Sequence, residues 1–242
     1  IRRELRDMLR EANVTASNDM LDRKINIALH DIHTNPGHNF PWAIRRSYLI
    51  THAPYTTGTV SITAATSRTA VVGSSTLWNT AVTGFGFNNA RVGGKMTFSG
   101  STDVHEVTEV TSDTAITISP RWVGADLRAA SYAYFEDEYV LATDFLRPLD
   151  LRFFSTDMNI PLIGPMEFRR RYPRNSTRSK PNVATFIQLP FLTNTTPRYR
   201  VVLRQTPNDE YSIPYDYITS YLAVTSAGVE ATQLVNDTDE PI

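Results

Sequence analysis

The chain has 242 residues and no cysteine, and its net charge is −1. Its length fits one large domain or two small ones, and its 41% hydrophobic residues suffice for a core of ordinary size. This composition excludes disulfides, thiolate catalysis and cysteine-based zinc sites, and it creates no global field that would attract nucleic acid or a membrane surface. Arginine supplies 21 of the 24 basic residues, which points to assembly because arginine is enriched at protein interfaces.

Two helices are predicted in a first segment that covers residues 1–56. Residues 2–12 contain good helix formers with apolar side chains on one face. A second helix is expected over residues 19–33, before a helix-ending Asn-Pro-Gly run. Its apolar stripe has helical spacing and is predicted to pack against the neighbouring helix or subunit: Leu21, Ile25, Leu29 and Ile32. This pattern predicts a helical hairpin, followed by a lead-in strand near residues 44–53.

Residues 57–141 form the second predicted segment, an inserted β domain. Apolar and β-branched polar residues alternate in it, as at Val60 and Ile62 and again at Ile116 and Ile118. Short alternating strands separated by Gly, Ser and Asp turns are typical of a small antiparallel barrel or sandwich. Strands are expected near residues 58–63, 69–73, 94–99, 104–110, 114–119 and 131–136.

The third predicted segment, residues 142–242, is a C-terminal α+β part. Thr143 or Asp144 can cap a short helix that extends to Leu151, and another helix is expected over residues 164–172. A β meander follows, with strands at 199–204 and 211–217. The complete prediction is an α+β fold with an N-terminal helical hairpin, an inserted antiparallel β barrel or sandwich, and this α+β part.

No pattern in the sequence predicts a catalytic, metal or cofactor site. His30 and His33 can share a helix face, but no carboxylate motif completes a metal site. The Gly93-Gly94-Lys95 run lacks the spacing of a phosphate loop and is better explained by a β turn. The Glu136-Asp137-Glu138 run is a carboxylate cluster at a strand end. Because side chains alternate along a strand, we expect these carboxylates not to converge, and to be solvated or salt-bridged.

The sharpest charge feature is an arginine cluster after residue 168. It could bind acidic residues or phosphates on a partner, or it could be a solvated helix end, where the helix dipole favours cations. The candidates for a partner interface are Arg169, Arg170, Arg171 and Arg174.

Several blocks of the sequence resemble the head-to-tail adaptor, or neck, proteins of tailed bacteriophages, mainly those with short tails. The most specific block runs from Asp137 to Leu149, and the resemblance covers roughly residues 20–242. Members of the family usually have proline before the Asp-Phe pair, where this chain has Ala142-Thr143, and the stretch 85–90 looks inserted. Members also usually continue into C-terminal helices, so the resemblance implies further chain beyond Ile242. The other matching blocks are residues 55–63, 76–78, 92–93, 107–110, 115–118, 205–211 and 237–242.

The resemblance implies a virion structural protein without catalysis or cofactor. It implies a homo-oligomeric ring, commonly a dodecamer, that is assembled in the host bacterial cytoplasm and located at the neck of the virion. Such a ring would bind the portal protein, dock tail nozzle or tail-fibre proteins, and surround a lumen through which packaged double-stranded DNA passes. No membrane contact is expected, because no apolar run approaches the roughly 18 residues that a membrane helix needs.

Two alternatives belong to other functional classes. A carbohydrate-binding or tail-fibre-type β module would use Trp78, Trp122 and Tyr132 as exposed stacking platforms, although these aromatics suit a core equally well. A hydrolase would depend on Glu136 and Glu138. Burial of the aromatic rings would argue against the carbohydrate-binding alternative.

Overall fold

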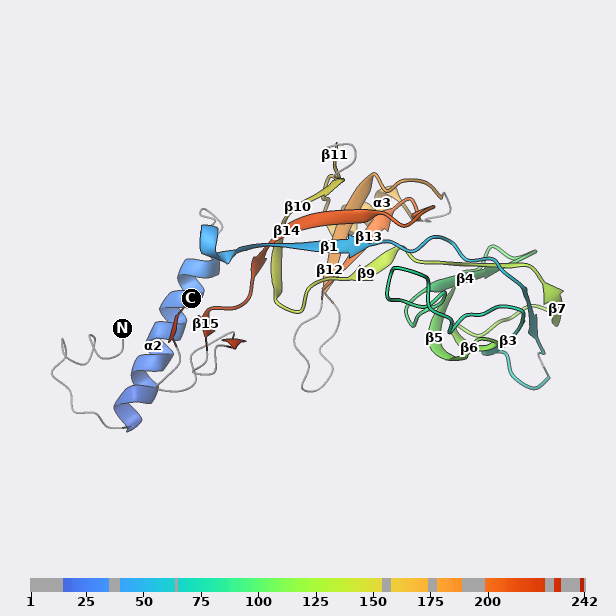
Figure 1. Ribbon diagram of the computed structural model, residues 1–242, viewed down its shortest axis with the longest axis horizontal. Coiled ribbons are helices and arrows are strands. Elements are labelled where there is room, and N and C mark those ends of the chain that lie inside the picture. Colours follow the sequence, from blue (N-terminus) through green and yellow to red (C-terminus); the bar gives the residue numbers. More distant parts are fainter. Residues whose placement is uncertain are drawn as a thin grey trace. The chain divides into compact units, whose positions relative to one another are not determined.

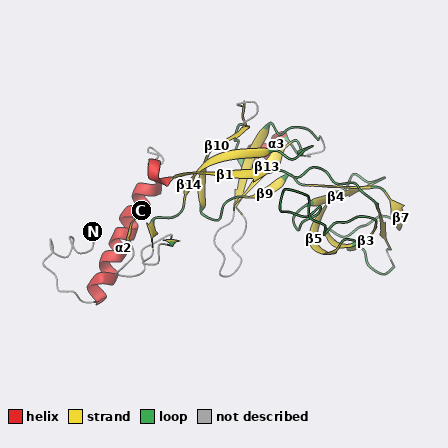
Figure 2. Cartoon of the chain, in the orientation of Figure 1, coloured by secondary structure: helices red, strands yellow, loops and turns green. Residues whose placement is uncertain are grey.

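The structure is a computed structural model that describes residues 15–34, 40–63, 65–153, 158–173, 178–188, 199–224, 229–231 and 240–241. Strands make up most of its regular structure, as Figure 2 shows. Its helical elements are α2 (Thr15–Thr34), the 3₁₀ turn η1 (Pro41–Ala43) and α3 (Pro165–Arg171). The chain divides into two compact units: unit 1 comprises Ile1–Ser47, Asp144–Leu149 and Asp216–Ile242, and unit 2 comprises Tyr48–Thr143 and Asp150–Tyr215.

A curled seven-stranded antiparallel sheet forms a large part of unit 2 (Figure 1). Its strands follow the order β7-β2-β3-β6-β5-β4-β8. Alternation places Val60 and Ile62 of β2, and Ile116 and Ile118 of β6, in the core of this sheet. The strand bounds are β2 (Thr59–Ile62), β3 (Ala70–Ser74), β4 (Lys95–Phe98), β5 (His105–Ser112), β6 (Ala115–Ser119), β7 (Leu127–Ala130) and β8 (Tyr132–Phe135).

A second sheet of unit 2 has three antiparallel strands in the order β12-β13-β9. Their bounds are β12 (Val183–Gln188), β13 (Tyr199–Arg204) and β9 (Glu138–Val140). Because β9 follows β8 after only two residues, Glu136 and Asp137, the chain passes directly from the seven-stranded sheet into this one. The helix α3 lies against β12, with proline at its first turn and Phe168 as its buried residue.

In unit 1, α2 buries one stripe of side chains. Leu21 and Ile25 are buried, and Ile25 packs with Leu29 and Ala223. At the last turn, Nε2 of the buried His33 lies against the carbonyl oxygen of Thr219. A small sheet of unit 1 has the order β16-β15-β17, with bounds β15 (Ala223–Val224), β16 (Glu230–Ala231) and β17 (Glu240–Pro241).

The remaining sheet has the order β1-β14-β10-β11. Its bounds are β1 (Ile44–Ile50), β14 (Ser212–Thr219), β10 (Phe145–Phe153) and β11 (Met158–Asn159). The boundary between the two units falls within β1, β10 and β14.

The predicted α+β fold class with an N-terminal helical hairpin is wrong, because strands dominate the described residues and the longer helix, α2, has no second helix paired with it there. The predicted helix over 2–12 lies outside those residues. The helix predicted to extend to Leu151 is instead the strand β10. Its Pro148 lacks the amide that a helix interior needs, which disfavours a helix through Leu151. The division into segments 1–56, 57–141 and 142–242 stays a prediction.

Candidate functional site

The predicted arginine cluster lies at the C-terminal end of α3. Arg169, Arg170 and Arg171 form the last turn and are exposed. Arg171 pairs with Glu167, one turn earlier, at 2.6 Å. Arg174 lies outside the described residues. The interface role of this cluster stays a prediction, and its three described arginines are open to solvent in the single chain.

The predicted packing stripe of α2 divides into two parts. Leu21 and Ile25 are buried and Leu29 is half-buried, whereas Ile32 is 45% exposed. His33, the next residue, is buried at that level of the helix instead. The stripe therefore runs 21, 25, 29 and 33, with a regular spacing of four residues.

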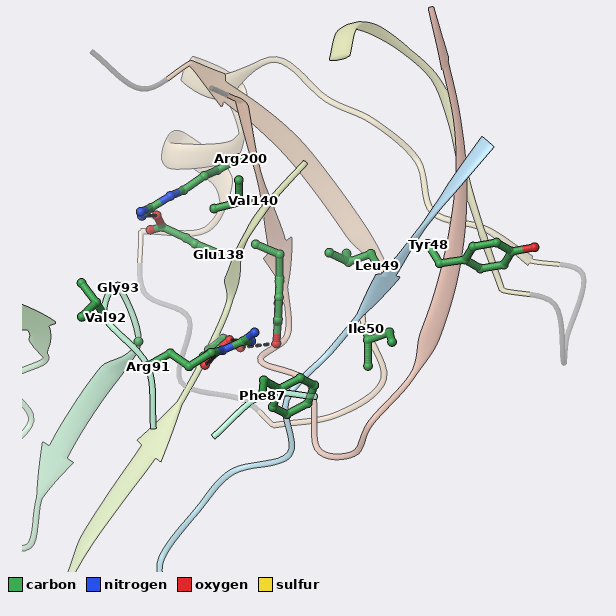
Figure 3. A pocket seen from close by; sticks show the side chains of 13 residues that line it. Tyr48, Leu49, Ile50, Phe87, Arg91, Val92, Gly93, Glu138, Val140 and Arg200 are labelled. Carbon is green, nitrogen blue, oxygen red and sulfur yellow. Dashed lines mark hydrogen bonds and ion pairs between the residues drawn. The ribbon is translucent and has the colours of Figure 1, made fainter. Parts of the chain in front are cut away.

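A pocket of about 400 Å³ lies in unit 2 where β8 leads into β9 (Figure 3). Apolar side chains from β1 and β9 line it, together with a loop that precedes β4. Arginine and glutamate side chains converge on the same space, as the dashed interactions in Figure 3 indicate. Its lining includes Ile50, Arg91, Val92, Glu138, Val140 and Arg200.

Arg91 holds Glu136 with both sides of its guanidinium group. Its Nε donates to Oε1 at 2.9 Å, and its Nη2 donates to Oε2. The hydroxyl of Tyr134 donates to the same Oε1. Burial and the charge of Glu136 raise the pKa of Tyr134 well above its usual value, so this phenol stays protonated and donates. The 5% exposed Glu136 side chain is therefore a fixed structural acceptor.

Lys95 links the other two carboxylates of the junction. Its Nζ lies 2.6 Å from Asp137 Oδ1 and 2.8 Å from Glu138 Oε1. Burial alone would lower the pKa of Lys95, but the two carboxylates outweigh it and raise this pKa above its usual value. The expectation that the carboxylates of the Glu136-Asp137-Glu138 run do not converge is wrong for Asp137 and Glu138. They meet at one ammonium group because Asp137 precedes β9, so the alternation of side chains along that strand does not apply to it.

Arg200 of β13 is less fully engaged than Arg91. Its Nη1 lies 3.5 Å from Glu138 Oε2, and its buried Nε has no hydrogen-bond partner among the described residues. The side chain is 22% exposed and borders the pocket. Gly93 lies opposite, where an added Cβ would come within 3.4 Å of Arg200 Nη2. The φ of +89° at Gly93 is a left-handed backbone conformation that favours glycine.

The aromatic residues considered as sugar platforms are buried. Trp78, Tyr132 and Trp122 are 0%, 5% and 6% exposed. The indole of Trp78 donates to Tyr132 Oη at 2.9 Å, and the indole of Trp122 donates to the carbonyl of Ala125 at 2.7 Å. No ring of the three has an open face for a sugar, which removes the basis of the carbohydrate-binding alternative.

The histidines do not assemble a metal site in the part of the chain that the structure describes. His30 is exposed and His33 is buried, so the two side chains lie in different environments. Within the described ranges, no group of three or more His, Asp or Glu side chains is placed to hold a metal ion.

Sequence reasoning missed Arg91, Lys95 and Arg200 as partners of the carboxylate run. Arg91 is 45 residues from Glu136, and Lys95 is 43 residues from Glu138, so no local spacing connects them. The sequence signal that could have found Arg91 and Lys95 is their position beside Gly93 and Gly94. Glycines permit close approach of another segment, and these basic residues are opposite in charge to the carboxylate run.

Comparison with protein-family models, curated proteins and solved structures finds no match for this chain. Among the described residues, no helix has the length and apolar character needed to cross a membrane.

Proposed function

We propose that this chain is a structural subunit of the neck of a tailed bacteriophage, an adaptor that joins the portal vertex to the tail. In this proposal the subunits form a homo-oligomeric ring that extends the DNA channel and docks tail nozzle or tail-fibre proteins. The proposal is supported by the family resemblance of the block from Asp137 to Leu149. It is also supported by the engagement of Glu136 and Glu138 in ion pairs, which gives a hydrolase no unoccupied carboxylate in this run.

The observation that carries the proposal is a second apolar surface on α2. Met20 and Ile27 are 42% and 55% exposed, although the helix already buries a separate stripe. Met20 and Ile27 are seven residues apart and so lie on the same side of the helix. A helix with apolar residues outside its buried stripe calls for another surface to cover them, and a neighbouring subunit or the portal supplies one.

The experiment mixes the purified chain with portal rings from the virus that encodes it and counts attached rings by electron microscopy. The wild type should cap the portal with a hollow ring. Ile27→Asp should reduce the attached fraction at least tenfold, because it places a charge in the apolar contact, whereas Ile27→Leu should bind like the wild type. Attachment that is equal for Ile27→Asp and Ile27→Leu would remove the support from α2, and no attachment of the wild type would contradict the proposal.

A further inference from the structure

The outer edge of β9 offers backbone groups that no described strand uses. In its antiparallel pairing with β13, the amide of Leu141 donates to Tyr199 O at 3.0 Å, and the amide of Leu203 donates to Asp137 O at 2.8 Å. Hydrogen-bonded pairs alternate with non-bonded pairs in such a ladder, so Tyr139 faces β13. The N–H and C=O groups of Glu138 and Val140 therefore point the opposite way, where β9 has no neighbouring strand among the described residues.

The edge of β9 carries no proline and no bulge, but the strand is only three residues long and includes Glu138. Edge strands are commonly blunted by proline, by a bulge, or by charged side chains along the strand. Here Val140 is 52% exposed and is bordered across the pocket by Val92 and Ile50, which are 64% and 38% exposed. Val140 and Ile50 both line the pocket, and Figure 3 shows Val140 close to Arg200. An apolar rim thus borders an unpaired strand edge.

Arg200 gives this edge a preference for one chemical group. It is the cross-strand partner of Val140 in a non-bonded pair, so both side chains lie on the same face of the sheet. Its guanidinium group has one long ion pair with Glu138, and the side chain is 22% exposed although its Nε is buried. A carboxylate matches such a fork of N–H donors in geometry and charge.

The charge of the surroundings favours a single carboxylate over a polyanion. Arg91, Lys95 and Arg200 face the carboxylates of residues 136–138, so three cations balance three anions. A nucleic acid would find no excess of positive charge here, since its binding depends on several unneutralised cations. One carboxylate needs only the unused donors of Arg200.

We propose that the free edge of β9 binds an extended polypeptide segment of a partner protein as a fourth strand of the β12-β13-β9 sheet. Its backbone pairs with the N–H and C=O groups of Glu138 and Val140, and its carboxylate side chain takes the donors of Arg200. Apolar residues two positions before and after that carboxylate share its face of the strand and lie against Val92, Val140 and Ile50. This site stands on the geometry of unit 2 alone and does not require ring formation.

The test selects a library of random blocked heptapeptides on the immobilised full-length chain. The expected winners contain Asp or Glu with Val, Ile or Thr two positions away. Arg200→Gln should abolish the preference for the acidic residue, so that an Asp peptide and its Asn counterpart bind equally. On the wild type the Asp peptide should bind about tenfold more tightly, the gain expected of one charge-assisted contact.

Two variants of Val140 separate the backbone from the side chain. Val140→Pro removes the N–H that faces the free edge and should weaken the selected peptide at least tenfold, whereas Val140→Ala keeps that N–H and should weaken it less than threefold. Thermal unfolding establishes that both variants are folded. If Val140→Ala is not folded, Val140→Thr takes its place. Absence of any enriched peptide, equal Asp and Asn binding to the wild type, or equal binding by Val140→Pro and Val140→Ala would each overturn the proposal.

Discussion

Arg91 and Glu136 form a two-pronged ion pair where β8 leads into β9, with Nε to Oε1 at 2.9 Å and Nη2 to Oε2. The Glu136 side chain is 5% exposed and the Arg91 side chain 36% exposed. The pair connects the loop before β4 to the segment that links the two sheets of unit 2. It therefore holds the pocket in shape rather than serving as a reactive group.

Arg91→Met should lower the free energy of unfolding by about 2–4 kcal/mol, because it leaves the buried Glu136 carboxylate without its counter-charge. Urea unfolding followed by tryptophan fluorescence measures the change. Arg128→Met is the control, since Arg128 is 89% exposed and 4.0 Å from Asp126, and it should change stability by less than about 0.5 kcal/mol. Similar losses in the two variants would show that the Arg91–Glu136 pair does not stabilise the junction.

Gly94→Ala should destabilise the chain by about 1–3 kcal/mol, because an added Cβ would overlap the ring and hydroxyl of the fully buried Tyr134. Gly164→Ala is the matched control, since a Cβ there meets nothing within 4 Å and its φ of −63° suits alanine. Differential scanning calorimetry should therefore give a clearly lower Tm for Gly94→Ala alone. A Tm equal to that of Gly164→Ala would mean that Tyr134 moves aside without cost.

His33 should make stability depend on pH. Burial lowers the pKa of His33 below its usual 6.5, and the positive charge of Arg147 acts in the same direction, against the raising effect of the hydrogen bond with the Thr219 carbonyl. The unfolded chain then binds the proton at a higher pH than the folded chain, so stability is full above about pH 6.5 and falls as the pH drops below it. Comparing urea midpoints from pH 8 to pH 5 in the wild type and in His33→Gln isolates this contribution. Parallel curves for the two proteins would exclude His33 as a source of the pH dependence.

Changing Arg169, Arg170 and Arg171 together to Ala should weaken subunit or portal association while leaving the fold intact. All three side chains are exposed, and the ion pair Arg171–Glu167, the one that these arginines form among the described residues, is worth about 0.3–0.5 kcal/mol. Association of the wild type should weaken as salt rises, whereas the variant should show a smaller salt dependence. Association measured at two ionic strengths gives four values. If they are equal, the cluster is a solvated helix end, and loss of DNA binding alone would place it on the channel wall.

The parts of the fold that the sequence reveals are those with local periodicity. The alternation around Val60 and Ile62 and around Ile116 and Ile118 predicts strands that are present as β2 and β6. The stripe at Leu21 and Ile25 predicts the buried face of α2. These patterns are readable because one side of each element faces a core and repeats at the period of that element.

The parts that the sequence hides depend on distant partners. Phe145 to Leu151 reads as a helix, yet it forms β10 beside β14, because pairing with residues far along the chain overrides local propensity. The partners of the carboxylates of residues 136–138 lie on β13 and around β4, and nothing in their spacing predicts that they meet. The candidate site was therefore recognisable as a charged run, but its ion pairs and its unpaired strand edge required the fold.

The most direct test of the central claim, a ring-forming structural subunit, is the mass of the native particle by light scattering at several concentrations. One chain has a mass of 27.2 kDa. We expect the wild type alone to form a discrete particle of many subunits, near twelve times the mass of one chain, or to add that mass to portal rings. A particle of 27.2 kDa at every concentration, with and without portal rings, would contradict it.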